Sequence, residues 1–275
     1  SQIITVDESG TYSVETNLST YNEISNNYSF DFLGERYITV NNPFYNNNST
    51  LFTINTWLFI EELNEPYGIS ILGNWQGGNG VFLLSYEPGE SLQNDQKICV
   101  HNSGGSLICF DLNDFDFDSW IHVSIIYDGA TMFLLKNGII EDSVYNPSLN
   151  ISTGSSILTF GVEENLNFCS SDETGCWFNG KMDDVQVWNY DLSLEEVQSY
   201  MYCPPIGNEN GLLGYWNFEN DNDIVYDLTN NLNNGIVYGA SLYSDNTPEF
   251  MCPLNFCSSS GEVTVTFNLE GCTDE

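Results

Sequence analysis

The run Asp114-Phe-Asp-Phe-Asp118 places three carboxylates at alternate positions. Three acidic residues at alternate positions could open an EF-hand calcium loop, which also requires a glycine and, further on, a bidentate glutamate. Ser119 and Ile125 occupy those two positions, so the run is not such a loop. If the segment is extended, its three carboxylates face one way and its two phenylalanines face the other.

Two other patterns could carry chemistry, and neither meets the requirements of its mechanism. Gly175-Cys-Trp-Phe-Asn-Gly-Lys181 has the spacing of a P-loop, but Met182 replaces the hydroxyl residue that binds Mg²⁺ and a strand pattern follows. The two histidines, His101 and His122, are too few and too separated for a catalytic triad with any serine. We expect His122 to be a packed residue within a strand.

The charge of the chain limits its partners. Its 275 residues include 39 acidic and only four basic ones, which gives a formal net charge of −35. Such a field repels phosphate backbones, so we expect no nucleic-acid partner, whereas divalent cations would be concentrated. Hydrophobic residues make up 41% of the chain, so it is not a disordered acidic tail. No apolar run reaches the roughly 18–20 residues that cross a bilayer, so no membrane insertion is expected.

The eight cysteines favour disulfides in an oxidising, extracellular compartment. Zinc is the alternative, but no Cys-x-x-Cys pair occurs. Cys99 and Cys109 flank a turn at Gly104, which would place them opposite one another on a hairpin. The other expected pairs are Cys169 with Cys176, Cys203 with Cys252, and Cys257 with Cys272, unless Cys272 pairs outside this sequence.

The expected elements are those of an antiparallel β-sandwich. Short segments rich in Val, Ile, Phe, Tyr and Thr alternate with clusters of Asn, Gly, Asp and Ser. Only Leu194–Met201 is expected to be helical, and Ser193 with Glu196 forms a capping box at its start. Because no helices lie between the strands, a parallel βαβ architecture is excluded.

Four blocks of this sequence, taken as a set, resemble laminin G-like domains of the concanavalin A-like superfamily. They are Tyr28–Val40, Phe52–Trp57, Ser119–Gly138 and the strand–aromatic–helix segment Trp177–Tyr200. The match covers about residues 28–202. The resemblance implies an all-β jelly roll of two antiparallel sheets, which serves as a binding module on secreted proteins.

One segment departs from the family order. Residues 211–240 resemble a segment that normally precedes the first strand, yet here they follow the helix. They either open a second domain or fold back to complete this one, and we expect the second on loop-length grounds. The expected organisation is an immunoglobulin-like repeat end or linker at 1–27, the jelly roll at 28–252, and the start of an acidic, cysteine-containing repeat at 253–275.

The resemblance also implies a calcium site, because related domains often hold a metal near the first aspartate of the closing strand. Calcium takes six to eight hard oxygen ligands. Carried onto this chain, the expected ligands are Asp183, Glu219 and Asp227, with Asp31 as a weaker candidate and the 233–235 backbone nearby. Solvated surface carboxylates are the alternative interpretation.

Sugar binding would need an exposed aromatic ring beside amide or carboxylate groups, because the ring offers an apolar face to a pyranose. The loop Trp75-Gln-Gly-Gly-Asn79 has this combination. We therefore expect Trp75, Gln76 and Asn79 to contact a ligand, with Tyr67 and Tyr86 as neighbours.

The sequence thus predicts a non-catalytic, calcium-stabilised adhesion module of a large secreted bacterial surface protein. Its partners would be surface glycans, surface proteins or neighbouring domains of the same chain. The Glu-x-Asp-x-x-Glu strand of the related laminarinase-type enzymes does not occur, which leaves a degenerate hydrolase as the least favoured interpretation. The main alternative is a structural subunit that associates with copies of itself in an extracellular filament.

Overall fold

The computed structural model describes residues 21–23, 25–33, 36–45, 47, 49–61, 69–74, 82–87, 96–102, 107–149, 155–162, 177–219, 223–239 and 243–253. The chain divides into two compact units, one formed by Ser25–Phe250 and the other by the two ends of the chain. In the unit formed by the ends, β1 (Tyr21–Glu23) pairs antiparallel with β18 (Met251–Pro253).

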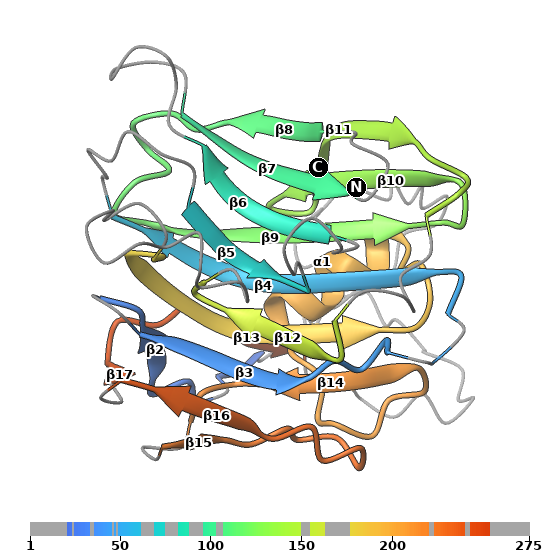
Figure 1. Ribbon diagram of the computed structural model, residues 1–275. Helices are drawn as coiled ribbons and strands as arrows, with labels where there is room; N and C mark the ends of the chain where they lie inside the picture. Colours follow the sequence, from blue (N-terminus) through green and yellow to red (C-terminus); the bar gives the residue numbers. More distant parts are fainter. Residues whose placement is uncertain are drawn as a thin grey trace, which may run out of the picture. The chain divides into compact units, whose positions relative to one another are not determined.

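Among the described residues, Ser25–Phe250 forms two antiparallel sheets of eight strands each, as expected for a jelly-roll sandwich (Figure 1). We call the first the helix-side sheet, because α1 lies against its outer face. Its strand order is β11-β10-β9-β4-β13-β2-β17, with β14 beside β13. The bounds are β2 (Ser29–Asp31), β4 (Phe52–Ile60), β9 (Trp120–Tyr127), β10 (Thr131–Lys136), β11 (Ile139–Tyr145), β13 (Gly180–Trp188), β14 (Leu212–Trp216) and β17 (Tyr243–Ser244).

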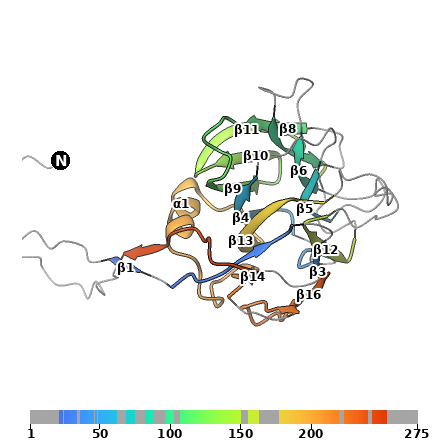
Figure 2. The same ribbon diagram turned by 90° about the vertical axis from the view of Figure 1, so that its left-hand side faces the viewer.

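The second sheet, which we call the far sheet, lies on the side of the core away from α1 (Figure 2). Its order is β15-β16-β3-β12-β5-β6-β7-β8. The bounds are β3 (Tyr37–Asn41), β5 (Ile69–Gly73), β6 (Phe82–Glu87), β7 (Lys97–Asn102), β8 (Leu107–Asp111), β12 (Ile157–Phe160), β15 (Ile224–Val225) and β16 (Gly235–Tyr238).

The main hydrophobic core fills the space between the two sheets. Alternate residues of each strand point inward, so Val185 and Val187 of β13 are buried there while their neighbours face outward. Phe160 of the far sheet meets Trp216 of the helix-side sheet with ring centroids 5.4 Å apart. Burying a side chain of this kind stabilises the fold by about 1.5–3 kcal/mol relative to exposure.

The helix α1 (Leu194–Tyr202) begins where the sequence predicts and ends one residue later. The Glu196 N–H donates to Ser193 Oγ at 3.2 Å, and the Ser193 N–H donates to Glu196 Oε2 at 2.8 Å, so both halves of the capping box form. Val197 and Met201, four residues apart, are the buried face. Val197 joins a second apolar cluster with Trp188 and Tyr215 on the outer face of the helix-side sheet.

The segment that follows the helix contributes strands to both sheets. β14 pairs with β13, and β16 pairs with β3 on the opposite side of the core. Just beyond β14, Phe218 lies 6.0 Å from Phe30 of β2, measured between ring centroids. The segment after the helix therefore contributes strands and core residues to the same sandwich as the strands before the helix.

The sequence pattern did not predict two strands of the helix-side sheet, β11 and the two-residue β17. β11 forms a hairpin with β10 through Asn137 and Gly138, which both have positive φ (49° and 74°), as a tight two-residue hairpin turn requires. β11 is an edge strand, and most of its residues are exposed. Its sequence therefore lacks the apolar alternation that marks a half-buried strand.

Candidate functional sites

A β-bulge in β13 brings two adjacent aspartates to the same side of the sheet. The register with β4 shifts between Asp183 and Gln186, and Asp184 adopts a positive φ of 53°. The neighbours Met182 and Val185 both point into the main core. The extra residue therefore leaves both carboxylates on the outer face of the helix-side sheet, where both are fully buried.

Burial dominates the electrostatics of these two carboxyl groups. Burial raises the pKa of Asp183 well above its ordinary value, and the nearby charges of Asp184 and Glu219 raise it further. Burial likewise raises the pKa of Asp184 to about 7, although hydrogen bonds from the Tyr215 hydroxyl and the Gln186 amide oppose this shift. Burial therefore favours the protonated, uncharged form of both carboxyl groups, and a bound cation would favour the ionised form.

Asp183 and Glu219 are joined through two consecutive asparagines before β2. Asn26 Nδ2 donates to Asp183 Oδ2 at 2.8 Å, and Asn27 Nδ2 donates to Glu219 Oε2 at 2.8 Å. Glu219 Oε1 also accepts the backbone N–H groups of Asn27 and Tyr28, at 2.7 and 3.0 Å. The structure thus connects two of the predicted calcium ligands through the donating side-chain amides of two neighbouring asparagines, which precede β2.

The other two predicted ligands lie in different surroundings. Asp227 accepts four hydrogen bonds, from the backbone of Tyr215, Thr229 and Asn233 and from the Thr229 hydroxyl, so it organises the loop between β15 and β16. Asp31 lies 3.9 Å from the Lys181 ammonium group. Neither Asp227 nor Asp31 shares a hydrogen-bond partner with Asp183 or Glu219 among the described residues, so the candidate site reduces to Asp183 and Glu219.

The oxygen-only chemistry of this pair suits calcium. Among the residues that the structure describes, no three His, Cys, Asp or Glu side chains gather into a metal site. Calcium bound to Asp183 and Glu219 would therefore need amide or backbone oxygens of Asn26 and Asn27 to complete its coordination.

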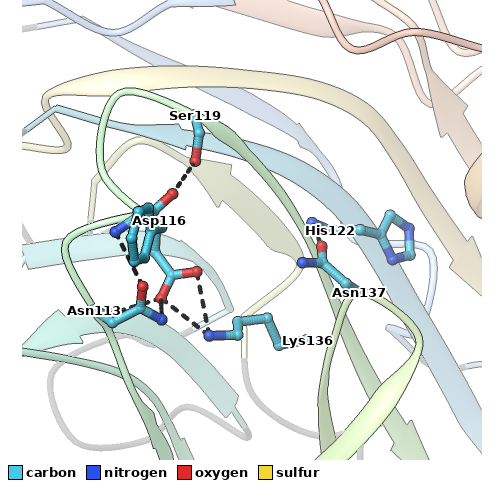
Figure 3. A network of polar contacts seen from close by, with 7 residues as sticks. Asn113, Asp116, Ser119, His122, Lys136 and Asn137 are labelled. Carbon is cyan, nitrogen blue, oxygen red and sulfur yellow. Dashed lines mark hydrogen bonds and ion pairs between the residues drawn. The ribbon is translucent and has the colours of Figure 1, made fainter.

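The acidic run at 114–118 forms a turn, so the predicted separation of its carboxylates from its phenylalanines is wrong. Asp116 is buried and binds Lys136 Nζ through both oxygens, at 3.2 and 3.0 Å, while Phe115 is exposed (Figure 3). The backbone N–H of Asn113 also donates to Asp116, at 2.8 Å. The run bends because Asp116 pairs with one of the four basic residues of the chain, which the alternating pattern could not reveal.

The predicted sugar-binding residues are placed as follows. Trp75, Gln76, Asn79 and Tyr67 lie outside the described residues. Tyr86 was predicted to border the ligand, and this is wrong: its side chain is fully buried in the main core. In β6 it occupies an inward position together with Leu84, because strand alternation sends both to the same face.

Sequence reasoning missed an aromatic row on the far sheet. Tyr37 of β3 stacks on Tyr238 of β16 with centroids 4.4 Å apart and rings parallel within 1°. Trp177 also lies near Tyr37, with 5.7 Å between the two ring centroids. Tyr238 is 41% exposed. The sequence did contain a signal for this row: Tyr37 and Tyr238 each stand next to a buried aliphatic residue, Ile38 and Val237, in a strand pattern.

The cysteines agree with the prediction wherever the structure describes them. Cys99 and Cys109 stand directly opposite on β7 and β8 and form a disulfide. Cys203 and Cys252 are each disulfide-bonded as well. Cys169, Cys176, Cys257 and Cys272 lie outside the described residues, so their pairing stays a prediction.

Comparisons with known proteins place this fold in a family. The model of the concanavalin A-like lectin/glucanases superfamily (Laminin_G_3) matches residues 32–198, more than half of the chain, so the chain belongs to that family. A search among curated proteins finds no similar sequence. In the described part of the chain, no helix has the length and apolar character needed to cross a bilayer.

Two solved structures illustrate the likeness. A Bacteroides ovatus protein to which carbohydrate binding is ascribed has a TM-score of 0.62 at 17% identity, over 82% of this chain and 62% of that one. This chain thus spans about three fifths of that protein's length. A native heptameric SAP-like pentraxin from Limulus polyphemus has a TM-score of 0.45 at 14% identity, over 84% of this chain and 94% of that one. At these identities the likeness concerns the fold alone.

Proposed function

We propose that this protein is a non-catalytic carbohydrate-binding module that acts outside the cell. The observation that carries the proposal is the partly exposed row of Tyr37, Tyr238 and Trp177 on the far sheet of a lectin-type sandwich. Aromatic rings at a surface provide the apolar contact that pyranose C–H groups need. The disulfides support an oxidising, extracellular compartment.

A binding role fits the carboxylates better than catalysis does. Asp183 and Asp184 are the carboxyl pair with the most strongly raised pKa among those described here, but both are fully buried. A glycosidase needs its two carboxyl groups on either side of a substrate bond in an accessible cleft. These two are instead buried on the outer face of the helix-side sheet, where Asn26 contacts Asp183 and Tyr215 contacts Asp184.

A glycan array with the intact chain tests this function. Binding to at least one glycan class, lost in the double variant Tyr37→Ala/Tyr238→Ala, is the expected result. Tyr145→Ala is the matched control, since Tyr145 is 71% exposed on β11 of the other sheet. Cleavage of a polysaccharide by the purified chain, or equal binding by the double variant, would count against the proposal.

Calcium belongs to the same proposal as a stabilising ion held by Asp183 and Glu219. It would supply the positive charge that these carboxylates need in order to remain ionised while buried or partly buried. An ion that binds only the folded chain stabilises it by about 2.7 kcal/mol at a hundredfold excess over Kd. Chelation should therefore lower the melting temperature, and Asp183→Asn should abolish that response.

Asp116→Asn is the matched control for the calcium experiment, because Asp116 is also a buried aspartate but is paired with Lys136. It should lower stability and keep the full response to chelator. If Asp183→Asn does not fold, calorimetric titration of the unaltered chain with calcium still decides the matter. Absence of both heat and melting shift would remove calcium from the proposal.

A further inference from the structure

Five of the eight strands of the far sheet carry no charged residue. The five consecutive strands β15, β16, β3, β12 and β5 contain no acidic or basic residue, although the chain has 39 acidic residues. Charges return only on the next three strands, as Glu87, Lys97 and Asp111. These five strands of a strongly acidic chain are therefore neutral, as β4 and β14 of the helix-side sheet also are, and charged residues stand just before two of them, at Arg36 and Asp223.

The edge of this neutral part of the far sheet exposes apolar side chains. Ile224 and Ile236 face each other across β15 and β16 and are 45% and 57% exposed. Ile236 is opposite Thr39, and two residues further along Tyr238 is opposite Tyr37. Since residues i and i+2 of a strand share a face, these side chains and Trp177 form one continuous surface. We call Tyr37, Thr39, Trp177, Ile224, Ile236 and Tyr238 the neutral patch.

The loop that borders the neutral patch is also uncharged at its surface. Between residues 224 and 238 the only carboxylate is Asp227, which is buried and holds the loop through its four hydrogen bonds. Besides Tyr226, the exposed polar side chains of this loop are the amides of Asn230, Asn231 and Asn234. Asn231 Nδ2 donates to the Leu213 carbonyl, and Asn234 Oδ1 accepts the Asp227 N–H. Amide groups can bind sugar hydroxyls as donors and as acceptors.

We propose that the neutral patch binds an uncharged polysaccharide and discriminates against uronate and sulfate chains. This rests on the proposed carbohydrate-binding function and names its ligand class. The overall charge of −35 repels anionic chains over a range of about 8–10 Å at physiological salt, whereas an uncharged chain feels no such field. A second copy of this protein would bring the same net charge, so charge complementarity favours a neutral glycan over self-association.

Affinity electrophoresis of the intact chain tests the proposal with matched pairs of polymers. Hydroxyethyl cellulose is compared with carboxymethyl cellulose, and methyl-esterified homogalacturonan with its de-esterified form, since each pair differs mainly in charge. Laminarin and galactomannan widen the neutral set. We expect retardation by at least one neutral polymer, at least tenfold stronger than by any anionic one.

Single substitutions test whether the neutral patch is where the polymer binds. Ile236→Asp should weaken binding of the neutral polymer at least tenfold, because a charge at that position must be desolvated under the ligand. Ile236→Lys should reduce the discrimination against anionic polymers, whereas Tyr145→Lys on the other sheet should leave it unchanged. Because Ile236 and Tyr145 are both well exposed, the melting temperatures of all three variants should stay close to that of the unaltered chain.

The outcomes separate the two levels of the proposal. Preferential binding of anionic polymers, or neutral binding that Ile236→Asp leaves intact, overturns the neutral patch while the carbohydrate-binding function stands. No binding of any polymer overturns both. A dimer in sedimentation that Ile236→Asp dissolves would assign the patch to self-association and support the filament subunit instead.

Discussion

The outer faces of the two sheets differ in a way that their sequences would not suggest. The helix-side sheet directs polar residues outward, and Asn55, His122, Asp184 and Gln186 are nevertheless all fully buried. The far sheet directs Ile236 and Tyr238 outward, and both are exposed. Exposure on either face is therefore decided by whether another segment covers it, and polarity alone is a poor guide.

Hydrogen bonds between the outward polar residues of the helix-side sheet offset part of the cost of burying them. Gln186 accepts from Asn55 Nδ2 at 3.2 Å and from Trp188 Nε1 at 3.3 Å, and donates to Asp184 at 2.6 Å. Such partners matter because an unpaired buried polar group costs about 1–3 kcal/mol. Among the described residues, Asn55 Oδ1, His122 Nε2 and Asp184 Oδ1 are buried without a hydrogen-bond partner. One face is thus packed beneath a helix, while the other leaves apolar side chains exposed.

The largest loss of stability is expected from removing all residues after Tyr202, because this truncation disrupts both sheets. This truncation removes β14 from the helix-side sheet and β16 from the far sheet, and it takes Trp216 and Phe218 out of the core. Open sheet edges and an unfilled core should give an aggregating or molten product. A chain truncated after Pro253 is the control and should melt cooperatively. A sharply melting 1–202 fragment would contradict the prediction.

A pair of substitutions sharpens the contrast between the faces. Trp188 is buried under α1 and contacts Tyr200, with ring centroids 4.7 Å apart, so Trp188→Ala should cost about 3–5 kcal/mol of unfolding free energy. Ile236→Ala on the far sheet should cost less than about 0.5 kcal/mol, because that side chain is already mostly in water. Denaturant unfolding measures both, and comparable losses would show that the patch is covered in solution.

The buried imidazole on the helix-side face should make the fold sensitive to acid. Burial lowers the pKa of His122 from 6.5 to about 3, so the folded chain keeps it neutral while the unfolded chain takes up a proton. Stability from this residue is complete above about pH 6.5 and falls as the pH drops toward 3. At pH 5 the loss should be about 2 kcal/mol.

His122→Gln isolates this contribution. Asp183 and Asp184 have raised pKa values, so their effect on stability has the opposite sign, and it is present in both proteins. The difference in unfolding free energy between the unaltered chain and His122→Gln should therefore shrink or reverse between pH 7 and pH 5. A difference that does not vary with pH would show that His122 is not buried in its neutral form.

The smallest effect concerns the helix that covers the helix-side sheet. Ser193→Ala removes the side chain that accepts the Glu196 N–H and should cost about 1 kcal/mol. Ser193→Asp is the matched variant, since an aspartate can accept the same bond and also favours the helix N-terminus. It should restore most of the melting temperature. If both variants lower the melting temperature equally, the capping hydrogen bond does not determine the stability of α1.

Local features of this protein were predictable because their causes lie within a few residues. The capping box set the start of α1, and the turn between Cys99 and Cys109 placed that disulfide. The two-sheet architecture followed from strand alternation and from the family blocks. Of the candidate calcium site, Asp183 and Glu219 do lie together, but the sequence could not distinguish them from Asp227, which a loop backbone holds.

Other features depend on contacts between residues far apart in the chain. The bulge that places Asp183 and Asp184 on one face arises from the register of β13 against β4, more than a hundred residues away. Asp116 turns inward to meet Lys136, and Tyr86 enters the core with Leu84. The neutral patch exists because β15, β16 and β3 pair side by side. β3 and β16 are nearly two hundred residues apart in the sequence, so only the folded chain brings them together. Sequence determined which side chains each strand presents, whereas tertiary pairing decided which of them share a face, and only the covering layer decided which reach solvent.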